Sequence, residues 1–141
     1  MIEVVNRQRK LPIDRSRWQV FGEKALKAIG GKADNATIAF VSNRQIQALN
    51  KRFRGLSRPT DVLSFPAGRE DLDHSSESFL GDIAISIEQA ESQAAANELD
   101  FDQEVAQLIL HGLLHLCGYD HETDKGQMNR LELRLRRKLG I

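Results

Sequence analysis

The chain has 141 residues, with 20 basic and 20 acidic side chains, four histidines and one cysteine. This length suits one domain with its own core, and a lone cysteine excludes an internal disulfide framework. The balanced net charge excludes a protein that coats nucleic acid through a large positive charge, although it allows a local basic patch. The longest stretch without a charged residue, 105–119, is shorter than the ~20 apolar residues of a membrane span, and no apolar run of signal-peptide length begins the chain. We expect a single cytoplasmic domain over residues 1–141 that does not enter a membrane.

Strand and helix patterns alternate along the first part of the chain, and helices follow. Strands are expected at residues 2–5, 37–41, 61–65 and 80–86, the last two antiparallel across a polar, acidic loop at 67–78. Helices are expected at 14–29, 87–99, 101–117 and 123–139. A further helix is predicted to begin after Ser42, which forms a capping-box pattern with Gln45, and to stop near Gly55. The order predicts an α+β domain with a small mixed four-stranded sheet and about five helices.

The residues suited to chemistry are concentrated at positions 111–121, HGLLHLCGYDH. On a helix, His111 and His115 leave the same face with Cβ atoms about 6 Å apart, so both rings can bind one ion. Gly118 allows the chain to leave the helix in a left-handed conformation, which returns His121 toward the first two rings. Three protein ligands leave a fourth tetrahedral position for water, as in catalytic zinc sites. We therefore predict one Zn²⁺ per chain at His111, His115 and His121.

The helix that carries this pair is apolar around most of its circumference, through Val105, Leu108, Ile109, Leu110, Leu113, Leu114 and Leu116. Such a helix is packed on several sides, which predicts a metal site on a central helix. The alternative for any single histidine is a hydrogen-bonded core residue, but three histidines at this spacing favour metal. His74, in the acidic loop, is expected to be solvated.

The histidine spacing resembles the extended zinc motif of the metzincin proteases, H-E-x-x-H-x-x-G-x-x-H. The residue after the first histidine is Gly112 here, whereas the proteases have a glutamate that takes the proton from the zinc-bound water. A glycine has no group that accepts a proton. A metallopeptidase is therefore disfavoured.

The full string HGLLHLCGYDH is similar to the signature of the YbeY-type endoribonucleases, the bacterial ribosomal-RNA maturation factors. Residues 54–66, RGLSRPTDVLSFP, and residues 80–86, LGDIAIS, also agree with that family, and the resemblance spans nearly the whole chain. It implies a zincin-like, single-domain α+β fold with a metal site of three histidines. It also implies a metal-dependent, single-strand-specific endoribonuclease acting in 16S rRNA 3′-end maturation and ribosome quality control, with the small ribosomal subunit and its assembly factors as partners.

A local basic segment precedes the third strand. Residues 43–60 contain no acidic side chain and five basic ones, Arg44, Lys51, Arg52, Arg54 and Arg58. A solvated helix face explains most of these equally well. Arg54 differs because it lies at the exit of the helix, and in the YbeY motif this arginine is implicated in catalysis. A guanidinium there would grip a phosphate oxygen with two parallel hydrogen bonds and stabilise the charge that accumulates on phosphorus.

These features predict metal-assisted hydrolysis of RNA phosphodiesters, in which the ion lowers the pKa of its bound water from ~15.7 toward ~7. Asp120 and Glu122 flank the third histidine and are candidates for orienting an imidazole or moving a proton, although we favour a role as helix-start carboxylates. Cys117 is expected to be a small buried hydrophobe and Met128 a core residue. The charges of the C-terminal helix, including Glu132, are expected to stay in water.

Three hypotheses for function remain at this point. The first is a metal-dependent endoribonuclease in rRNA processing. The second is a non-catalytic, zinc-containing ribosome assembly factor. The third is the metallopeptidase, which Gly112 disfavours.

Overall fold

A computed structural model describes residues 1–31, 35–67, 79–120 and 122–141. The elements follow the order β1 (Ile2–Asn6), α1 (Arg15–Ile29), β2 (Asn35–Val41), α2 (Asn43–Arg54), β3 (Val62–Pro66), β4 (Phe79–Ser86), α3 (Ile87–Ala96), α4 (Phe101–Leu116) and α5 (Gln127–Leu139). The sheet has the strand order β1-β2-β4-β3; the first three strands are parallel, and β3 is antiparallel to β4 at one edge. The predicted α+β domain with a mixed four-stranded sheet and five helices is confirmed.

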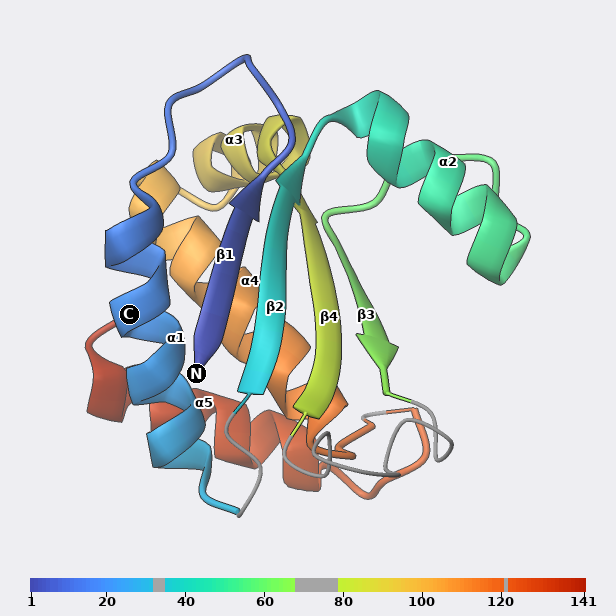
Figure 1. Cartoon of the computed structure of the whole chain (residues 1–141). Helices are drawn as coiled ribbons and strands as arrows, with labels where there is room; N and C mark the ends of the chain where they lie inside the picture. Colours follow the sequence, from blue (N-terminus) through green and yellow to red (C-terminus); the bar gives the residue numbers. More distant parts are fainter. Residues whose placement is uncertain (32–34, 68–78, 121) are drawn as a thin grey trace.

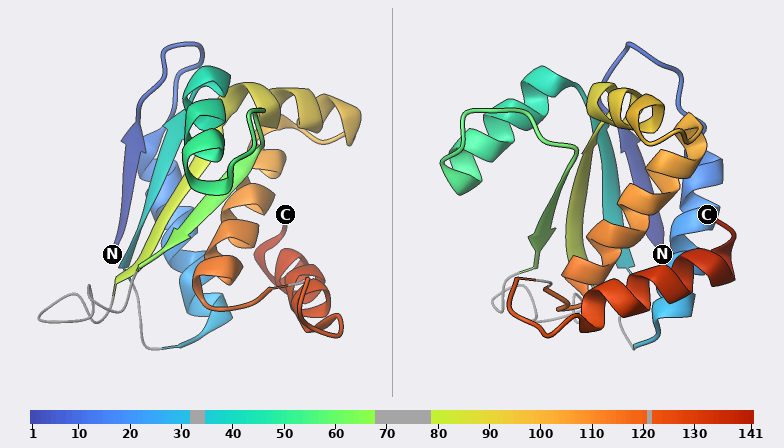
Figure 2. Two further views of the ribbon diagram at one scale, coloured as in Figure 1. Left: turned by 90° about the vertical axis from the view of Figure 1, so that its right-hand side faces the viewer. Right: turned by 180° about the vertical axis from the view of Figure 1, so that it is seen from behind.

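The helices α1, α4 and α5 cover one face of the sheet (Figures 1 and 2), and α4 runs between the sheet and α5. The main core fills this layer with side chains that are fully buried, among them Phe40 of β2, Ile83 of β4 and Leu113 of α4. The predicted central helix is therefore α4. Its apolar circumference contacts the sheet on one side and its neighbouring helices on the others.

A glycine sets how closely α4 approaches β4. A Cβ atom added at Gly112 would lie 2.9 Å from Cδ1 and 3.0 Å from Cγ2 of Ile83, which is closer than carbon atoms pack in protein interiors. The Oγ of Ser64 on β3 donates a hydrogen bond of 3.3 Å to the carbonyl oxygen of Gly112. Together these contacts hold the histidine-bearing turn of α4 against the sheet and beside its edge strand.

The helix α2 packs over the other face of the sheet, where Val41, Ile46, Leu63 and Ala84 form a second, smaller core. The predicted capping box is present: the Oγ of Ser42 accepts from the backbone N–H of Gln45, and the Gln45 side chain accepts from the N–H of Ser42. Gly55, with φ of 72°, ends the helix in the left-handed conformation, where glycine carries no steric cost.

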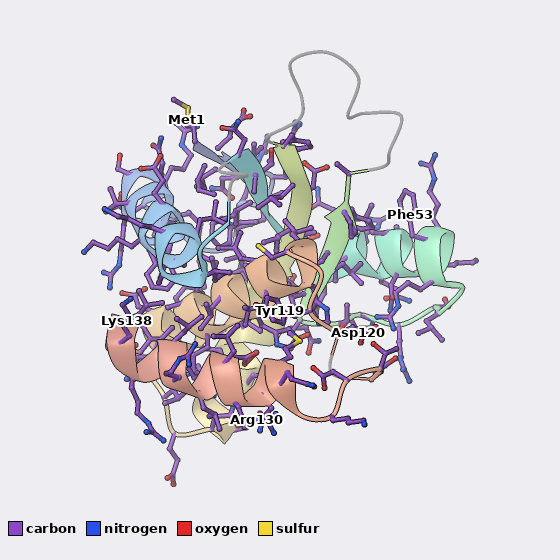
Figure 3. The ribbon with its side chains drawn as sticks, turned by 90° about the horizontal axis from the view of Figure 1, so that it is seen from below. Met1, Phe53, Tyr119, Asp120, Arg130 and Lys138 are labelled. Atoms are coloured by element: carbon purple, nitrogen blue, oxygen red, sulfur yellow. The ribbon has the colours of Figure 1, made fainter. Side chains whose placement is uncertain are left out.

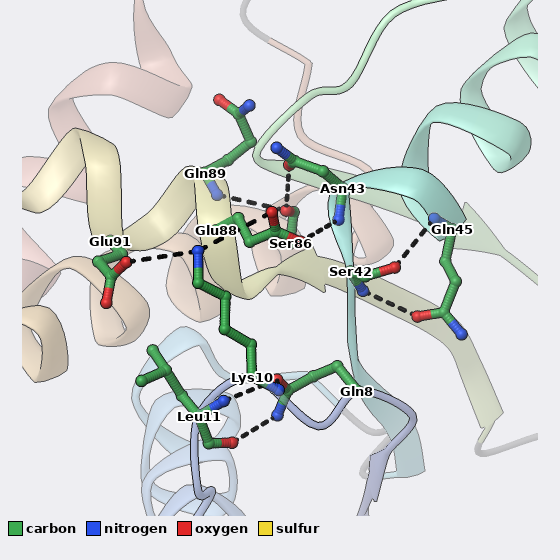
Figure 4. A network of polar contacts seen from close by, with 10 residues as sticks. All are labelled: Gln8, Lys10, Leu11, Ser42, Asn43, Gln45, Ser86, Glu88, Gln89 and Glu91. Atoms are coloured by element: carbon green, nitrogen blue, oxygen red, sulfur yellow. Dashed lines mark hydrogen bonds and ion pairs between the residues drawn. The ribbon is translucent and has the colours of Figure 1, made fainter.

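A polar network ties the start of α2 to the start of α3 (Figure 4). The Oγ of Ser86 donates to Oδ1 of Asn43 at 2.7 Å, and the backbone N–H of Asn43 donates to Oε1 of Glu88 at 3.0 Å. Lys10 places its Nζ 4.0 Å from Glu88 and 3.9 Å from Glu91. This network fixes the N-terminal end of α2, whereas Arg54 is at its C-terminal end. It therefore sets the direction of the helix axis and with it the position of Arg54.

Two predicted helix boundaries are wrong. The helix expected over residues 87–99 ends at Ala96, because Glu98 adopts a positive φ of 57°. The helix expected from residue 123 begins at Gln127, after Gly126 adopts φ of 94°. Most of the expected loop at 67–78, including His74, lies outside the described residues. No helix in the described ranges is both long enough and apolar enough to cross a membrane.

Candidate active site

A cavity of about 500 Å³ lies where α4, the edge strand β3 and the end of α2 meet. It is lined by Arg54, Thr60, Asp61, Val62, Leu63, Ser64, Pro66, His111, His115, Gly118, Tyr119, Asp120 and Glu122. The structure therefore brings Arg54, His111 and His115 to one cavity, although Arg54 is far from the histidines in sequence. The strand β3 forms one wall of this cavity.

The Nε2 atoms of His111 and His115 point toward each other. Their Nε2 atoms are 3.1 Å apart, and their ring centroids are 4.7 Å apart at an interplanar angle of 78°. Two imidazole nitrogens bound to one tetrahedral Zn²⁺ at 2.0–2.1 Å would be separated by about 3.3 Å. The pair thus fits a shared ion. The third predicted ligand, His121, lies outside the described residues, so its position stays a prediction.

His111 has a partner that was not expected from the sequence. Oε1 of Glu132, on α5, lies 2.7 Å from Nδ1 of His111, and the Glu132 side chain is buried. Its second carboxylate oxygen accepts a hydrogen bond of 2.9 Å from Nη2 of Arg136. Because the ionised carboxylate only accepts hydrogen bonds, His111 donates from Nδ1, and the lone pair of its neutral ring is on Nε2, facing His115.

The charge state of Glu132 follows from two opposing effects. Burial alone raises the pKa of this carboxyl, but the hydrogen bond and charge of His111, together with Arg136, outweigh burial and hold the pKa below its ordinary value. The expectation that the charges of the C-terminal helix all stay in water is therefore wrong for Glu132. One signal was available in the sequence: α5 has five arginines and lysines but only one acidic residue, Glu132, and Arg136 follows it one turn later.

Arg54 is the last residue of α2, and its side chain is exposed at the wall of the cavity. The other basic residues of the segment, Arg44, Lys51, Arg52 and Arg58, are exposed as well, in agreement with a solvated surface. Beside them, Phe53 is 56% exposed and its ring packs edge-on against Phe65 with centroids 5.1 Å apart. Seen from below, Phe53 on α2 and Asp120 after α4 lie on the same side of the molecule (Figure 3).

The two carboxylates beside the third histidine do not start a helix, so that interpretation is wrong. Asp120 accepts from the backbone N–H of Glu122 at 2.9 Å and organises a turn. The carboxylate that starts α5 belongs to Asp124, which accepts from the N–H groups of Gly126 and Met128. Asp120 and Glu122 both line the cavity, which keeps them as candidates for proton transfer.

The remaining expectations concern the sulfur-containing residues. Met128 is 1% exposed and belongs to the main core, as predicted. Cys117 follows α4, packs against the same core and is half-buried. Its burial raises the pKa of the thiol, and Cys117 is not part of the lining of the cavity that holds His111 and His115. Cys117 is therefore a packing residue, as expected.

Comparisons with known proteins agree on one family. The family model described as Endoribonuclease YbeY matches residues 3–140. A protein named Endoribonuclease YbeY from Thermoanaerobacter sp. (strain X514) is 39% identical over 139 residues, covering 88% of this chain and 86% of that protein. One of the same name from Carboxydothermus hydrogenoformans is 37% identical and covers 100% of this chain and 99% of its own. The solution structure of a Thermotoga maritima protein superposes with a TM-score of 0.63 at 28% identity, covering 99% of this chain and 90% of that chain.

Proposed function

The chain belongs to the YbeY endoribonuclease family, and from this premise we propose that it hydrolyses phosphodiester bonds of single-stranded RNA with one bound Zn²⁺. His111, His115 and His121 would hold the ion. The observation that carries the proposal is the 3.1 Å approach of the two Nε2 atoms inside a cavity that Arg54 also lines. A bound Zn²⁺ would supply a Lewis acid that lowers the pKa of water and polarises a phosphate oxygen.

The chain's own residues supply the other parts of the reaction. Arg54 would bind a non-bridging phosphate oxygen and stabilise the charge that develops on phosphorus, because its guanidinium offers paired donors. Glu132 keeps the proton of His111 on Nδ1, which leaves Nε2 available as a ligand. Asp120 and Glu122, two of the carboxylates on the cavity wall, would take or return a proton.

The metallopeptidase hypothesis is further weakened by packing. The position after the first histidine points into the sheet, where an added Cβ would lie 2.9 Å from Ile83. A glutamate side chain at position 112 therefore has no space on the sheet side of α4 and no path into the cavity. The peptide-cleaving mechanism of the metzincin proteases needs that glutamate as its general base.

In the cell, we propose a role in maturation of the 16S rRNA 3′ end and in ribosome quality control. The partners would be ribosomal RNA, the small ribosomal subunit and its assembly factors, in the cytoplasm. The exposed basic residues of α2 and the loop after it support contact with RNA, because they provide positive charge next to the cavity. A non-catalytic assembly factor with a structural zinc is the alternative, and an activity assay separates the two.

The deciding experiment is incubation of zinc-loaded protein with single-stranded rRNA fragments. Arg54→Ala, which removes an exposed side chain, is expected to keep the zinc and the fold but to cleave at least tenfold more slowly, since a charged contact to the transition state is lost. Chelated protein and His115→Ala are expected to be inactive. Arg15→Ala, on the exposed surface of α1 and outside the basic segment of α2, is the matched control for loss of one positive charge and is purified identically. Equal cleavage by parent, Arg54→Ala and His115→Ala proteins would reveal a contaminating ribonuclease and contradict the proposal.

A further inference from the structure

A second cavity, of about 520 Å³, adjoins the first. It is lined by Asp61, Val62, Gln93, Asn97, Leu99, Glu104, Gln107, Leu108, His111 and Arg136. Both linings include Asp61, Val62 and His111. The His111 ring and the start of β3 therefore separate the second cavity from the first. An RNA strand with one phosphodiester at the histidine pair would thus place a neighbouring nucleotide in the second cavity.

The lining of the second cavity is rich in side-chain amides. Asn97 donates from Nδ2 to Oε1 of the buried Glu104 at 2.8 Å, which orients both groups. Within the described ranges, Gln93 and Gln107 engage their side-chain amides in no hydrogen bond with another residue. Each of these two amides therefore offers both a donor and an acceptor to a ligand.

The charges of this cavity argue against a phosphate. Its carboxylates are Asp61 and Glu104, and the charge of Arg136, its only arginine or lysine within the described residues, is offset by Glu132 at 2.9 Å. A phosphate would meet two anions and one neutralised cation. The Nε of Arg136 is buried and has no hydrogen-bond partner in the described structure. Since buried donors are normally hydrogen-bonded, this N–H is available to an acceptor on a ligand.

We propose that this cavity binds one nucleobase of the RNA strand, adjacent to the phosphodiester at the histidine pair; this rests on the proposed function. Nucleobase edges carry donors and acceptors side by side, and they are neutral, so they match amides placed between carboxylates. Gln93 and Gln107 would bind the edge of the base. The volume lies within the usual range of small-ligand pockets. The cavity would thus give the enzyme a base preference at one position beside the cut.

The experiment is sequencing of the products that zinc-loaded protein makes from a single-stranded RNA pool randomised around one cleavage region. The parent is expected to prefer particular bases at one position beside the cut. Gln93→Ala and Gln107→Ala are each expected to reduce that preference about fivefold or more, since each removes a hydrogen bond to the base, while zinc content stays unchanged. Gln19→Ala, on α1 and outside the lining of both cavities, is the matched control. Preferences in both variants identical to the parent would overturn the proposal.

A binding measurement keeps the proposal separate from the proposed function. A single-stranded DNA oligonucleotide of the preferred sequence, or of mixed sequence if the parent cleaves nothing, is titrated into ¹⁵N-labelled protein. The side-chain amide signals of Gln93 and Gln107 are expected to shift, and those of Gln19 to stay. An inactive parent whose Gln93 and Gln107 signals shift would contradict the nuclease function and retain the base site. Unshifted amides would overturn the base site whatever the activity.

Discussion

Replacing Glu132 by glutamine tests whether α5 prepares His111 for metal binding. The carboxylate joins Nδ1 of His111 at 2.7 Å to Nη2 of Arg136 at 2.9 Å, and both partners donate. Glutamine keeps the shape but has one accepting oxygen, so one of the two donors must face its NH₂ group. If the oxygen turns toward Arg136, His111 loses its acceptor and its proton is no longer held on Nδ1.

The expected loss is a 10- to 100-fold weaker affinity for Zn²⁺, the range found when the group that hydrogen-bonds a ligating histidine is removed. This corresponds to about 1.4–2.7 kcal/mol. The fold should survive, because the hydrogen bonds at stake are few and the apolar neighbours of Glu132 on α5, such as Met128 and Leu135, stay buried. Metal affinity is therefore expected to fall while the secondary structure stays that of the parent.

The assay is competition for Zn²⁺ against a chelator of known affinity, with ¹⁵N NMR of the metal-free protein to follow which nitrogen of His111 carries the proton. Glu23→Gln, on the exposed surface of α1, is the control for loss of one negative charge. The parent is expected to show His111 protonated on Nδ1, and Glu132→Gln a mixture of tautomers. A zinc affinity of Glu132→Gln within twofold of the parent would refute this reasoning.

Three further expectations follow from the same contacts. Gly112→Ala should destabilise the protein by about 1–3 kcal/mol, because its Cβ would lie 2.9 Å from Ile83; urea denaturation should show a smaller loss when it is introduced into an Ile83→Val background, and an equal loss would contradict the clash. In zinc-free protein, the pKa of Glu132 lies below its ordinary 4.5 because His111 and Arg136 outweigh the effect of burial, so its ionised form stabilises the fold above that pH. The advantage of the parent over Glu132→Gln should shrink as pH falls below ~4.5, and an advantage that grows with acid below that pH in a series of unfolding curves would show the sign to be wrong. Binding of a single-stranded oligonucleotide, followed by fluorescence anisotropy, should weaken with salt with a slope of about −0.7 per phosphate contact, and a flat salt response would remove the basic residues of α2 from the interface.

Features that depend on neighbouring residues in the chain could be predicted from the sequence. The capping box of Ser42, the stop at Gly55 and the antiparallel pairing of β3 with β4 are confirmed, since each follows from local chemistry or from two adjacent patterns. The pair His111 and His115 faces one cavity because residues four apart on a helix share a face. The existence of α5 was predictable as well, but its start was not, because Asp124 rather than an earlier carboxylate binds the first free N–H groups.

Features that depend on how the helices pack could not be predicted. Glu132 lies 21 positions after His111, and its carboxylate meets the ring only because α5 crosses α4. On a basic amphipathic helix, an isolated glutamate is more often exposed, so the sequence marks Glu132 as isolated among basic residues but does not predict its burial against His111. The amides of Gln93 and Gln107 likewise share a cavity only once α3 and α4 are packed together. The position of Arg54 was expected from the family resemblance, and the structure supplies the reason, which is the direction of α2.

The close contact at Gly112 connects the fold to the chemistry of the site. Because α4 rests against Ile83 with no space for a Cβ, the residue after the first histidine is not available to take a proton. A hydrolase with this helix must place its proton-transfer group elsewhere. Of the described carboxylates that line the cavity, Asp61 binds its own neighbour, the N–H of Val62, at 2.8 Å, and Asp120 binds the N–H of Glu122 at 2.9 Å. Glu122 is exposed, and within the described part of the chain its carboxylate accepts no hydrogen bond. Among the three, it is therefore the carboxylate whose loss should change the pH profile of cleavage while leaving the backbone of the site in place.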